Sequence, residues 1–313
     1  MPRALLAALL TLAVAAGCAG RAAANGFTGG KLDVVTAFYP LQFLSERVGG
    51  DAVTVTNLTK PGAEPHDVEL NPRQVAQVAD AGVAVHLRGF QPAVDAAVAQ
   101  EAKGRSFDVA SVVALQPFSD DDEDREGSKD PHVWLDPLRF ATIAGKLGDR
   151  LAEADPAHAA GYRARASQLQ DQLQGLDHTY AESLANCARR ELVTSHEAFG
   201  YLAARYGLTQ VGITGISPEA EPSPRRLAQV AAQARATGTT TIFFETLVSP
   251  KVAETIAREV GAKTAVLDPL EGLTDAEPTR GGKPQNEPQK GADYFTVMRA
   301  NLAALTTALG CTS

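Results

Sequence analysis

The sequence predicts an α/β protein with two lobes, each a mainly parallel sheet flanked by helices, joined by one long rigid helix. Two observations support this fold class. Short apolar segments alternate with amphipathic helical segments in both halves of the chain, an order that is typical of a parallel sheet covered by helices. Between the halves, one apolar stripe continues at spacings of three and four residues without an interrupting proline, which is typical of a long helix.

The first half of the chain contains four segments with the composition of strands, which are residues 32–38, 52–58, 83–87 and 107–109. Helices are predicted over 40–48, from Asn71-Pro72 onward, and over 91–102. A glycine pair, Gly49-Gly50, ends the first helix. The second helix is identified by its start, because asparagine as a cap with proline in the first turn is typical of a helix N-terminus.

One long helix is predicted to connect the halves, and Asp155-Pro156 begins it. Its one-sided stripe consists of Tyr162, Ala166, Leu169, Leu173, Leu176, Tyr180 and Leu184. Two-lobed binders that are joined by flexible strands close through large hinge angles. We expect this stiffer connector to permit much less movement.

The second half repeats the alternation of strands and helices. Strands are predicted at 192–194, 210–213, 240–244 and 264–267, and helices at 198–206, from Ser223-Pro224, from Ser249-Pro250, and over about 293–309. Polar residues follow several of these strands directly. Open parallel sheets place their binding sites at the carboxyl ends of strands, so a site is expected at this edge.

The chain therefore divides into a signal peptide (1–17), a tether (18–30), an N-terminal α/β lobe (31–154), a connector helix (155–186) and a C-terminal α/β lobe (187–313). One positive charge, a short apolar run and small residues before Cys18 are typical of a secretory signal peptide. The run is shorter than the ~20 apolar residues that a transmembrane helix needs. The residues before Cys18 resemble a bacterial lipobox, so a lipid on this cysteine is expected.

Composition restricts the functional classes. With 313 residues, 44% hydrophobic and 21% charged, this is an ordinary soluble globular chain that is long enough for two domains. Its formal net charge of -8, without a basic cluster, excludes a nucleic-acid partner and favours cations. If Cys18 carries lipid, Cys187 and Cys311 remain, and export to an oxidising compartment predicts a disulfide between them.

Four short segments each end an apolar stretch with a side chain that can bind a metal. These side chains are His66, His132, His196 and Asp268. Three imidazoles and one carboxylate make a closed tetrahedral set of the kind that zinc favours. Because two of the four lie in each half, the sequence predicts a Zn²⁺ ion clasped between the lobes.

Other polar residues allow more than one interpretation. Glu245 ends a predicted strand on the same side, either as an acceptor that orients a ligand histidine or as a solvated carboxylate. Taken alone, Asp268 before Pro269 would be a turn or capping residue, and the company of the three histidines favours a ligand. Glu64, two residues before His66, is interpreted as a surface carboxylate, with a substitute ligand as the alternative. Three further histidines are interpreted as ordinary polar groups, namely His86, His158 and His178.

The segments PGAEPHDVEL, DPHVWLDP, TSHEAFGYLAARYGL and VLDPLEGL together resemble the metal-binding solute-binding proteins of bacterial ABC importers, which take up zinc or manganese. The resemblance extends from about Lys31 to the C-terminus, and the stretch 215–223 matches a further signature. It implies one metal between two lobes, held by His66, His132, His196 and Asp268. Histidine at position 196 goes with zinc uptake in this family, where glutamate goes with manganese.

The resemblance further implies an extracytoplasmic receptor without enzymatic activity, a monomer that is lipid-anchored to the cell membrane. It would deliver Zn²⁺ to a permease driven by a cytoplasmic ATPase. One feature departs from many zinc-uptake members. An acidic loop, residues 120–126, stands where they carry a histidine-rich loop.

Three other interpretations are a manganese receptor of the same family, a secreted zinc hydrolase, and a surface adhesin, a role that some relatives of the family have been assigned. Catalytic zinc usually keeps one open position, whereas four ligands are expected here. The segment after His196 begins like the HExxH motif of zinc proteases, but Gly200 stands at the position of the second histidine. No sequence feature independently supports an adhesin.

Overall fold

The computed structural model describes residues 26–117, 129–273, 279–280, 283–284 and 293–312. The predicted signal peptide, Cys18 and the acidic run 120–126 lie outside these residues. None of the helices that the structure describes is both long and apolar enough to cross a membrane.

The first sheet is parallel except for its first strand in the chain, β1. β2 (Lys31–Thr36) pairs with β3 (Val53–Asn57) on one side and with β4 (Val83–His86) on the other, and β5 (Ser106–Asp108) pairs with β4. β1 (Phe27–Thr28) runs antiparallel to β2. The tether predicted over 18–30 therefore does not extend to residue 30, because Phe27 and Thr28 already belong to the sheet.

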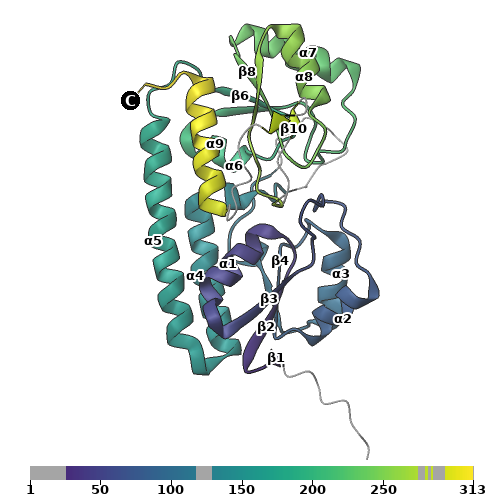
Figure 1. Cartoon of the computed structure of the whole chain (residues 1–313), viewed down its shortest axis with the longest axis vertical. Coiled ribbons are helices and arrows are strands. Elements are labelled where there is room, and N and C mark those ends of the chain that lie inside the picture. The colour runs from purple at the N-terminus through teal and green to yellow at the C-terminus, as the bar shows by residue number, and fades with distance from the viewer. Residues whose placement is uncertain (1–25, 118–128, 274–278, 281–282, 285–292, 313) are drawn as a thin grey trace, which may run out of the picture.

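Three helices accompany this sheet in the N-terminal lobe (Figure 1): α1 (Tyr39–Gly49), α2 (Pro72–Asp80) and α3 (Pro92–Glu101). The predicted start of α2 is confirmed in detail. The Asn71 side chain accepts hydrogen bonds from the backbone N–H groups of Arg73 and Gln74, and the Gln74 side-chain oxygen accepts one from the backbone N–H of Asn71. This reciprocal capping satisfies donors that a helix start otherwise leaves unpaired. Short 3₁₀ turns follow α1 (η1, Gly50–Ala52) and β5 (η2, Val109–Ser111).

Two long helices lie side by side along one edge of the molecule (Figure 1). The sequence predicted α5 (Ala159–Ser183), which follows the 3₁₀ turn η5 (Pro156–His158), and α5 buries the apolar stripe from Tyr162 to Tyr180. It did not predict α4 (Pro137–Ala154), which follows the 3₁₀ turn η4 (Val133–Leu135). Asp136 caps α4 by accepting hydrogen bonds from the first backbone N–H groups of the helix.

α5 contacts both halves of the protein. Near its start, the Arg165 guanidinium donates to the carbonyl oxygens of Val48 and Gly49 at the end of α1, at 2.8 and 2.6 Å. Near its end, the Tyr180 hydroxyl donates to the carbonyl of Met298 in α9 (Tyr294–Leu309) at 2.6 Å. The connector is therefore fastened to helices from both ends of the chain.

The second sheet is parallel throughout, in the order β7 (Thr209–Gly212), β6 (Glu191–Thr194), β8 (Thr241–Phe244), β9 (Lys263–Val266). α6 (Gly200–Tyr206), α7 (Pro224–Ala236) and α8 (Lys251–Val260) connect its strands, and α9 completes the C-terminal lobe (Figure 1). β10 (Thr279–Arg280) and β11 (Lys283–Pro284) form a separate antiparallel pair. The predicted α/β class, with parallel sheets flanked by helices, is confirmed.

The hydrophobic core consists of two clusters of buried residues. Its larger part extends from the first sheet through α4 and α5 to buried residues of α6 and α9. A smaller part lies among β6, β8, α7 and α8. Because the larger part includes buried residues of both lobes, it packs the two lobes against each other.

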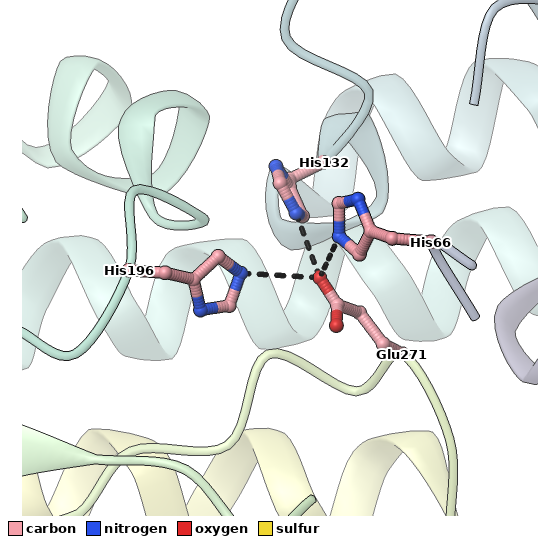
Figure 2. Close-up of side chains that lie close together, drawn as sticks. All are labelled: His66, His132, His196 and Glu271. Atoms are coloured by element: carbon pink, nitrogen blue, oxygen red, sulfur yellow. Dashed lines mark hydrogen bonds and ion pairs between the residues drawn. The ribbon is translucent and has the colours of Figure 1, made fainter. Parts of the chain in front are cut away.

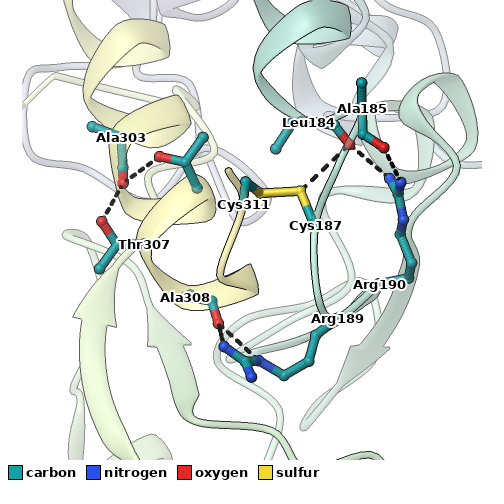
Figure 3. The surroundings of a disulfide bond; sticks show 10 residues. Leu184, Ala185, Cys187, Arg189, Arg190, Ala303, Thr307, Ala308 and Cys311 are labelled. Atoms are coloured by element: carbon teal, nitrogen blue, oxygen red, sulfur yellow. Dashed lines mark hydrogen bonds between the residues drawn. A yellow bond between two sulfur atoms is a disulfide. The ribbon is translucent and has the colours of Figure 1, made fainter. Parts of the chain in front are cut away.

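The predicted disulfide is confirmed, as Figure 3 shows. Cys187, just after α5, is bonded to Cys311, just after α9, across a sequence separation of 124 residues. Arg189 reinforces the junction, because its guanidinium donates to the carbonyl of Ala308 at 3.1 and 3.0 Å. The bond therefore ties the end of the chain to the start of the second sheet.

Candidate metal centre

Four side chains converge between the lobes: His66, His132, His196 and Glu271 (Figure 2). Their donor atoms all lie within 4.8 Å of one another. The Nε2 atoms of the histidines lie 3.1, 2.7 and 3.3 Å, in that order, from Oε1 of Glu271. Four ligands at tetrahedral zinc distances would lie about 3.3 Å apart, so this donor set fits Zn²⁺ with only small shifts.

Each of the four residues lies in a loop between regular elements. His66 lies between β3 and α2, and His132 immediately precedes η4. His196 follows β6, and Glu271 lies in the loop after β9. Two therefore come from the N-terminal half and two from the C-terminal half, in the arrangement that the sequence predicted.

Asp268, predicted as the fourth member, is not part of this group. Its Oδ1 atom accepts a hydrogen bond from the backbone N–H of Leu270 at 2.7 Å, and its Oδ2 atom accepts one from the Thr246 hydroxyl at 3.1 Å. Burial raises the pKa of this carboxyl to about 6. Asp268 thus shapes the turn before Glu271, which is the ordinary role of an aspartate before proline.

His132 is completely buried, and a carboxylate fixes its ring. Its Nδ1–H donates to Oδ1 of Asp130 at 2.8 Å, and its backbone N–H donates to the same oxygen at 2.9 Å. With Nδ1 protonated, the lone pair of the neutral ring is on Nε2, the atom that faces Glu271. Sequence reasoning did not identify Asp130. An aspartate two residues before a ligand histidine was the available signal.

His196 has the same arrangement. Its Nδ1–H donates to Oε1 of Glu245 at 2.8 Å, and the Ser195 hydroxyl donates to that oxygen at 2.8 Å. Both the histidine and the glutamate side chain are 1% exposed. Of the two interpretations of Glu245, the geometry corresponds to the acceptor that orients a histidine.

His66 is held differently. Its side chain is 10% exposed, and its ring packs edge-on against Phe90 with the centroids 4.6 Å apart. Its backbone N–H donates to Oε1 of Glu64 at 2.8 Å. Within the described ranges, no carboxylate contacts its Nδ1 atom. Glu64 is partly buried and not a surface carboxylate, and burial together with nearby Glu271 raises its pKa to about 8.

The imidazoles and carboxylates of the centre shift one another's pKa values. Burial alone would lower the pKa of His196, but Glu245 and Glu271 outweigh it and hold that pKa well above its ordinary value. The pKa of His132 is also raised, because Asp130 and Glu271 outweigh burial. Burial would raise the pKa of Glu271, yet the neighbouring histidines hold it well below its ordinary value.

This arrangement is suited to holding a cation. Three nitrogen donors and one oxygen donor match the tetrahedral set that zinc favours. One oxygen of Glu271 and one of Glu245 are buried without a hydrogen-bond partner among the described residues. A bound divalent cation would compensate this buried negative charge.

Comparison with known proteins identifies relatives. The family model described as zinc-uptake complex component A, periplasmic, matches residues 34–308. The chain is 36% identical over 296 residues to the zinc-binding protein AdcA of Streptococcus pyogenes, covering 88% of this chain and 56% of the relative, so it spans about half of that protein. It is 32% identical to the high-affinity zinc uptake system protein ZnuA of Bacillus subtilis, covering 97% and 96%.

Among solved structures, the Zn(II)-bound ZnuA-like domain of Streptococcus pneumoniae AdcA superposes with a TM-score of 0.74 at 34% identity, covering 90% of this chain and 99% of that one. The chain belongs to the zinc-uptake component A family. The resemblance seen in the sequence is confirmed.

Proposed function

We propose that this protein is an extracytoplasmic receptor that captures Zn²⁺ and delivers it to an ABC permease driven by a cytoplasmic ATPase. The observation that carries the proposal is the convergence of three imidazole nitrogens and one carboxylate oxygen in a buried centre. The family supports it, since its members in the comparison are named for zinc binding and zinc uptake.

His66, His132, His196 and Glu271 are the proposed ligands, and Glu271 replaces Asp268 in the predicted set. Asp130 and Glu245 hold the rings of the two buried histidines with Nε2 toward the ion. Such outer hydrogen bonds fix the tautomer of a ligand histidine and raise its basicity. The site is therefore largely formed before the metal arrives.

Zinc is the cargo that this donor set favours over manganese. Mn²⁺ stands at the weak end of the Irving–Williams order and prefers oxygen-rich sites of higher coordination. Zn²⁺ has no geometric preference of its own and accepts three nitrogens and one oxygen in a tetrahedron. The closed donor set and the family also support a carrier rather than a hydrolase.

The proposed cellular setting comes from the sequence. The segment 1–17 is a signal peptide, and lipid on Cys18 anchors a monomer outside the cell membrane. The proposed domain limits are those given above, except that the tether ends before β1. The acidic stretch before His132 favours cations through its charge alone.

A competition titration tests the cargo. Protein purified without chelator should contain zinc, and after metal removal it should bind one Zn²⁺ per chain. An equal concentration of Mn²⁺ should leave bound zinc in place. Displacement of zinc by equal manganese would favour the manganese receptor instead, and a chain that binds neither metal would exclude both receptors.

A further inference from the structure

The loop that presents Glu271 contains an unusual turn. Among the residues that the structure describes, Leu270 is the one non-glycine residue with a positive φ, 61°. The Cβ of an L-residue crowds the following carbonyl in this conformation. Leu270 is nonetheless fully buried and directly precedes Glu271. Such a conformation persists only when its surroundings hold it.

Asp268 and Asn301 hold the turn from the C-terminal lobe. Oδ1 of Asp268 accepts the hydrogen bond from the Leu270 N–H at 2.7 Å. Asn301, on α9 and 2% exposed, receives the Asp268 N–H on its Oδ1 at 2.9 Å and donates from Nδ2 to the Asp268 carbonyl at 2.7 Å. Both backbone groups of Asp268 are thereby fixed.

Trp134 holds the same turn from the other side. Its Nε1–H donates to the carbonyl of Pro269 at 2.7 Å, and the side chain is almost fully buried. Its ring lies 5.3 Å from the ring of His132, two residues earlier in the chain. One hydrogen bond therefore connects the segment that carries His132 with the segment that carries Glu271.

We propose that Asp268, Asn301 and Trp134 are positioning residues that hold Leu270 in its strained conformation and thereby aim the Glu271 carboxylate at Zn²⁺, an inference that rests on the proposed function. The three residues approach the turn from β9's end, from α9 and from η4. Loss of one bond lets Leu270 relax to negative φ, and this rotation carries Glu271 away from the histidines.

A double-mutant cycle tests the role of Asp268. Asp268→Ala should weaken zinc binding about tenfold or more, the usual effect of removing an outer partner. Asp268→Asn should restore the affinity, because its amide oxygen still accepts from Leu270. In a Glu271→Ala background, Asp268→Ala should have no further effect. A matched control is Asp108→Ala, which removes a carboxylate that caps two backbone N–H groups far from the ligands in sequence.

The role of Trp134 has a spectroscopic readout. Trp134→Phe keeps an aromatic ring and removes the hydrogen bond to Pro269. In Co²⁺-loaded protein, this change should alter the visible bands of four-coordinate cobalt in the same direction as Glu271→Ala. Tyr180→Phe, which removes another buried donor to a backbone carbonyl, should leave the bands unchanged.

The outcomes separate the two proposals. The positioning role alone would be overturned if the losses of zinc affinity in Asp268→Ala and Glu271→Ala were additive. It would also be overturned if Asp268→Asn lost as much affinity as Asp268→Ala. Either result would show that Asp268 acts independently of Glu271. Unchanged cobalt bands in Trp134→Phe would overturn it for Trp134. A wild-type protein that does not bind zinc would overturn the proposed function and the positioning role with it.

Discussion

The two fully buried histidines of the centre differ from the third in how they are held. His132 and His196 are each bonded through Nδ1 to a buried carboxylate, at 2.8 Å in both cases. His66 is 10% exposed, and among the described residues no carboxylate contacts its Nδ1 atom, although its backbone N–H donates to Glu64. The buried pair is therefore fixed in orientation before metal binds, while His66 lies on a loop at the accessible side.

This difference predicts that the three histidines contribute unequally to zinc affinity. A ligand whose ring is fixed by a buried partner contributes affinity, because its orientation does not have to be acquired on binding. A ligand without such a partner can turn aside at lower cost. The predictions below test that contrast.

The largest effects should follow loss of a ligand ring. Structural zinc sites bind the ion with free energies of roughly 10–16 kcal/mol, so each of four ligands contributes about 3 kcal/mol. His66→Ala should therefore raise the Kd for zinc ~100-fold. His132→Ala and His196→Ala should weaken zinc binding more than His66→Ala does. They should also lower stability by about 3 kcal/mol, because each leaves a carboxylate buried without its partner. Calorimetry and thermal unfolding measure both quantities.

The control for this series is His158→Ala, which removes a half-exposed histidine on the 3₁₀ turn before α5. It should leave zinc affinity unchanged. Equal losses of affinity and stability for all three ligand variants would remove the distinction between the buried pair and His66.

Removing the outer carboxylates should have the next largest effect. Asp130→Asn and Glu245→Gln should each weaken zinc binding about 10- to 100-fold. Asp95→Asn is a matched control, since Asp95 contacts Nδ1 of His86 in the same way outside the centre. If the control weakens binding as much as Asp130→Asn, the carboxylates act through general stability and not through the ligand rings.

Stability should depend on pH in opposite directions with and without zinc. A histidine with a raised pKa stabilises the fold fully below its unfolded value of 6.5 and loses this as pH rises through its folded pKa, which applies to His132 and His196. The raised pKa of Glu64 acts in the same direction. The lowered pKa of Glu271 has the opposite effect, because its contribution to stability is lost as pH falls, but this occurs only below pH 4.5.

Metal-free protein should therefore lose this contribution as pH rises above about 6.5 through the raised folded pKa values of the two histidines, while zinc-loaded protein gains stability because Zn²⁺ competes with the same protons. Thermal unfolding of both forms across this range measures the slopes. Parallel slopes for the two forms would mean that zinc does not displace protons from these imidazoles.

Reduction of the disulfide should have the smallest effect on the centre. Cys187–Cys311 closes a loop with a separation of 124 residues, so its loss should cost roughly 4–5 kcal/mol of stability in the chain-entropy model. Zinc affinity at a temperature where the protein remains folded should change little. If reduction instead lowered zinc affinity as much as Asp130→Asn does, the disulfide would contribute to holding His196 in place.

Local sequence signals were sufficient for most of the fold. The alternation of apolar and helical segments predicted the parallel sheets, and the uninterrupted stripe of α5 predicted the connector. α4 begins with Asp136-Pro137, the same dipeptide that indicated the connector at Asp155-Pro156, so a comparable signal was present and was not used. Only two cysteines remained after Cys18, and the disulfide followed.

Local sequence signals predicted only part of the metal centre. Each of the three histidines lies in a specific segment at the end of a strand or loop, and that placement was visible. The choice between Asp268 and Glu271 depends on a turn through a strained leucine, which no local preference of leucine predicts. The contact of Glu245 with His196 spans 49 residues, and only the folded sheet brings them together.

The most direct test of the account is the position of the ion itself. In crystals of the zinc-loaded protein, anomalous diffraction at the zinc edge should show one ion bonded to Nε2 of His66, His132 and His196 and to the carboxylate of Glu271, at about 2.0–2.2 Å. The Nδ1 contacts of the two buried rings should remain in place. An ion bound by Asp268 in place of Glu271, or one located away from the three histidines, would contradict the account.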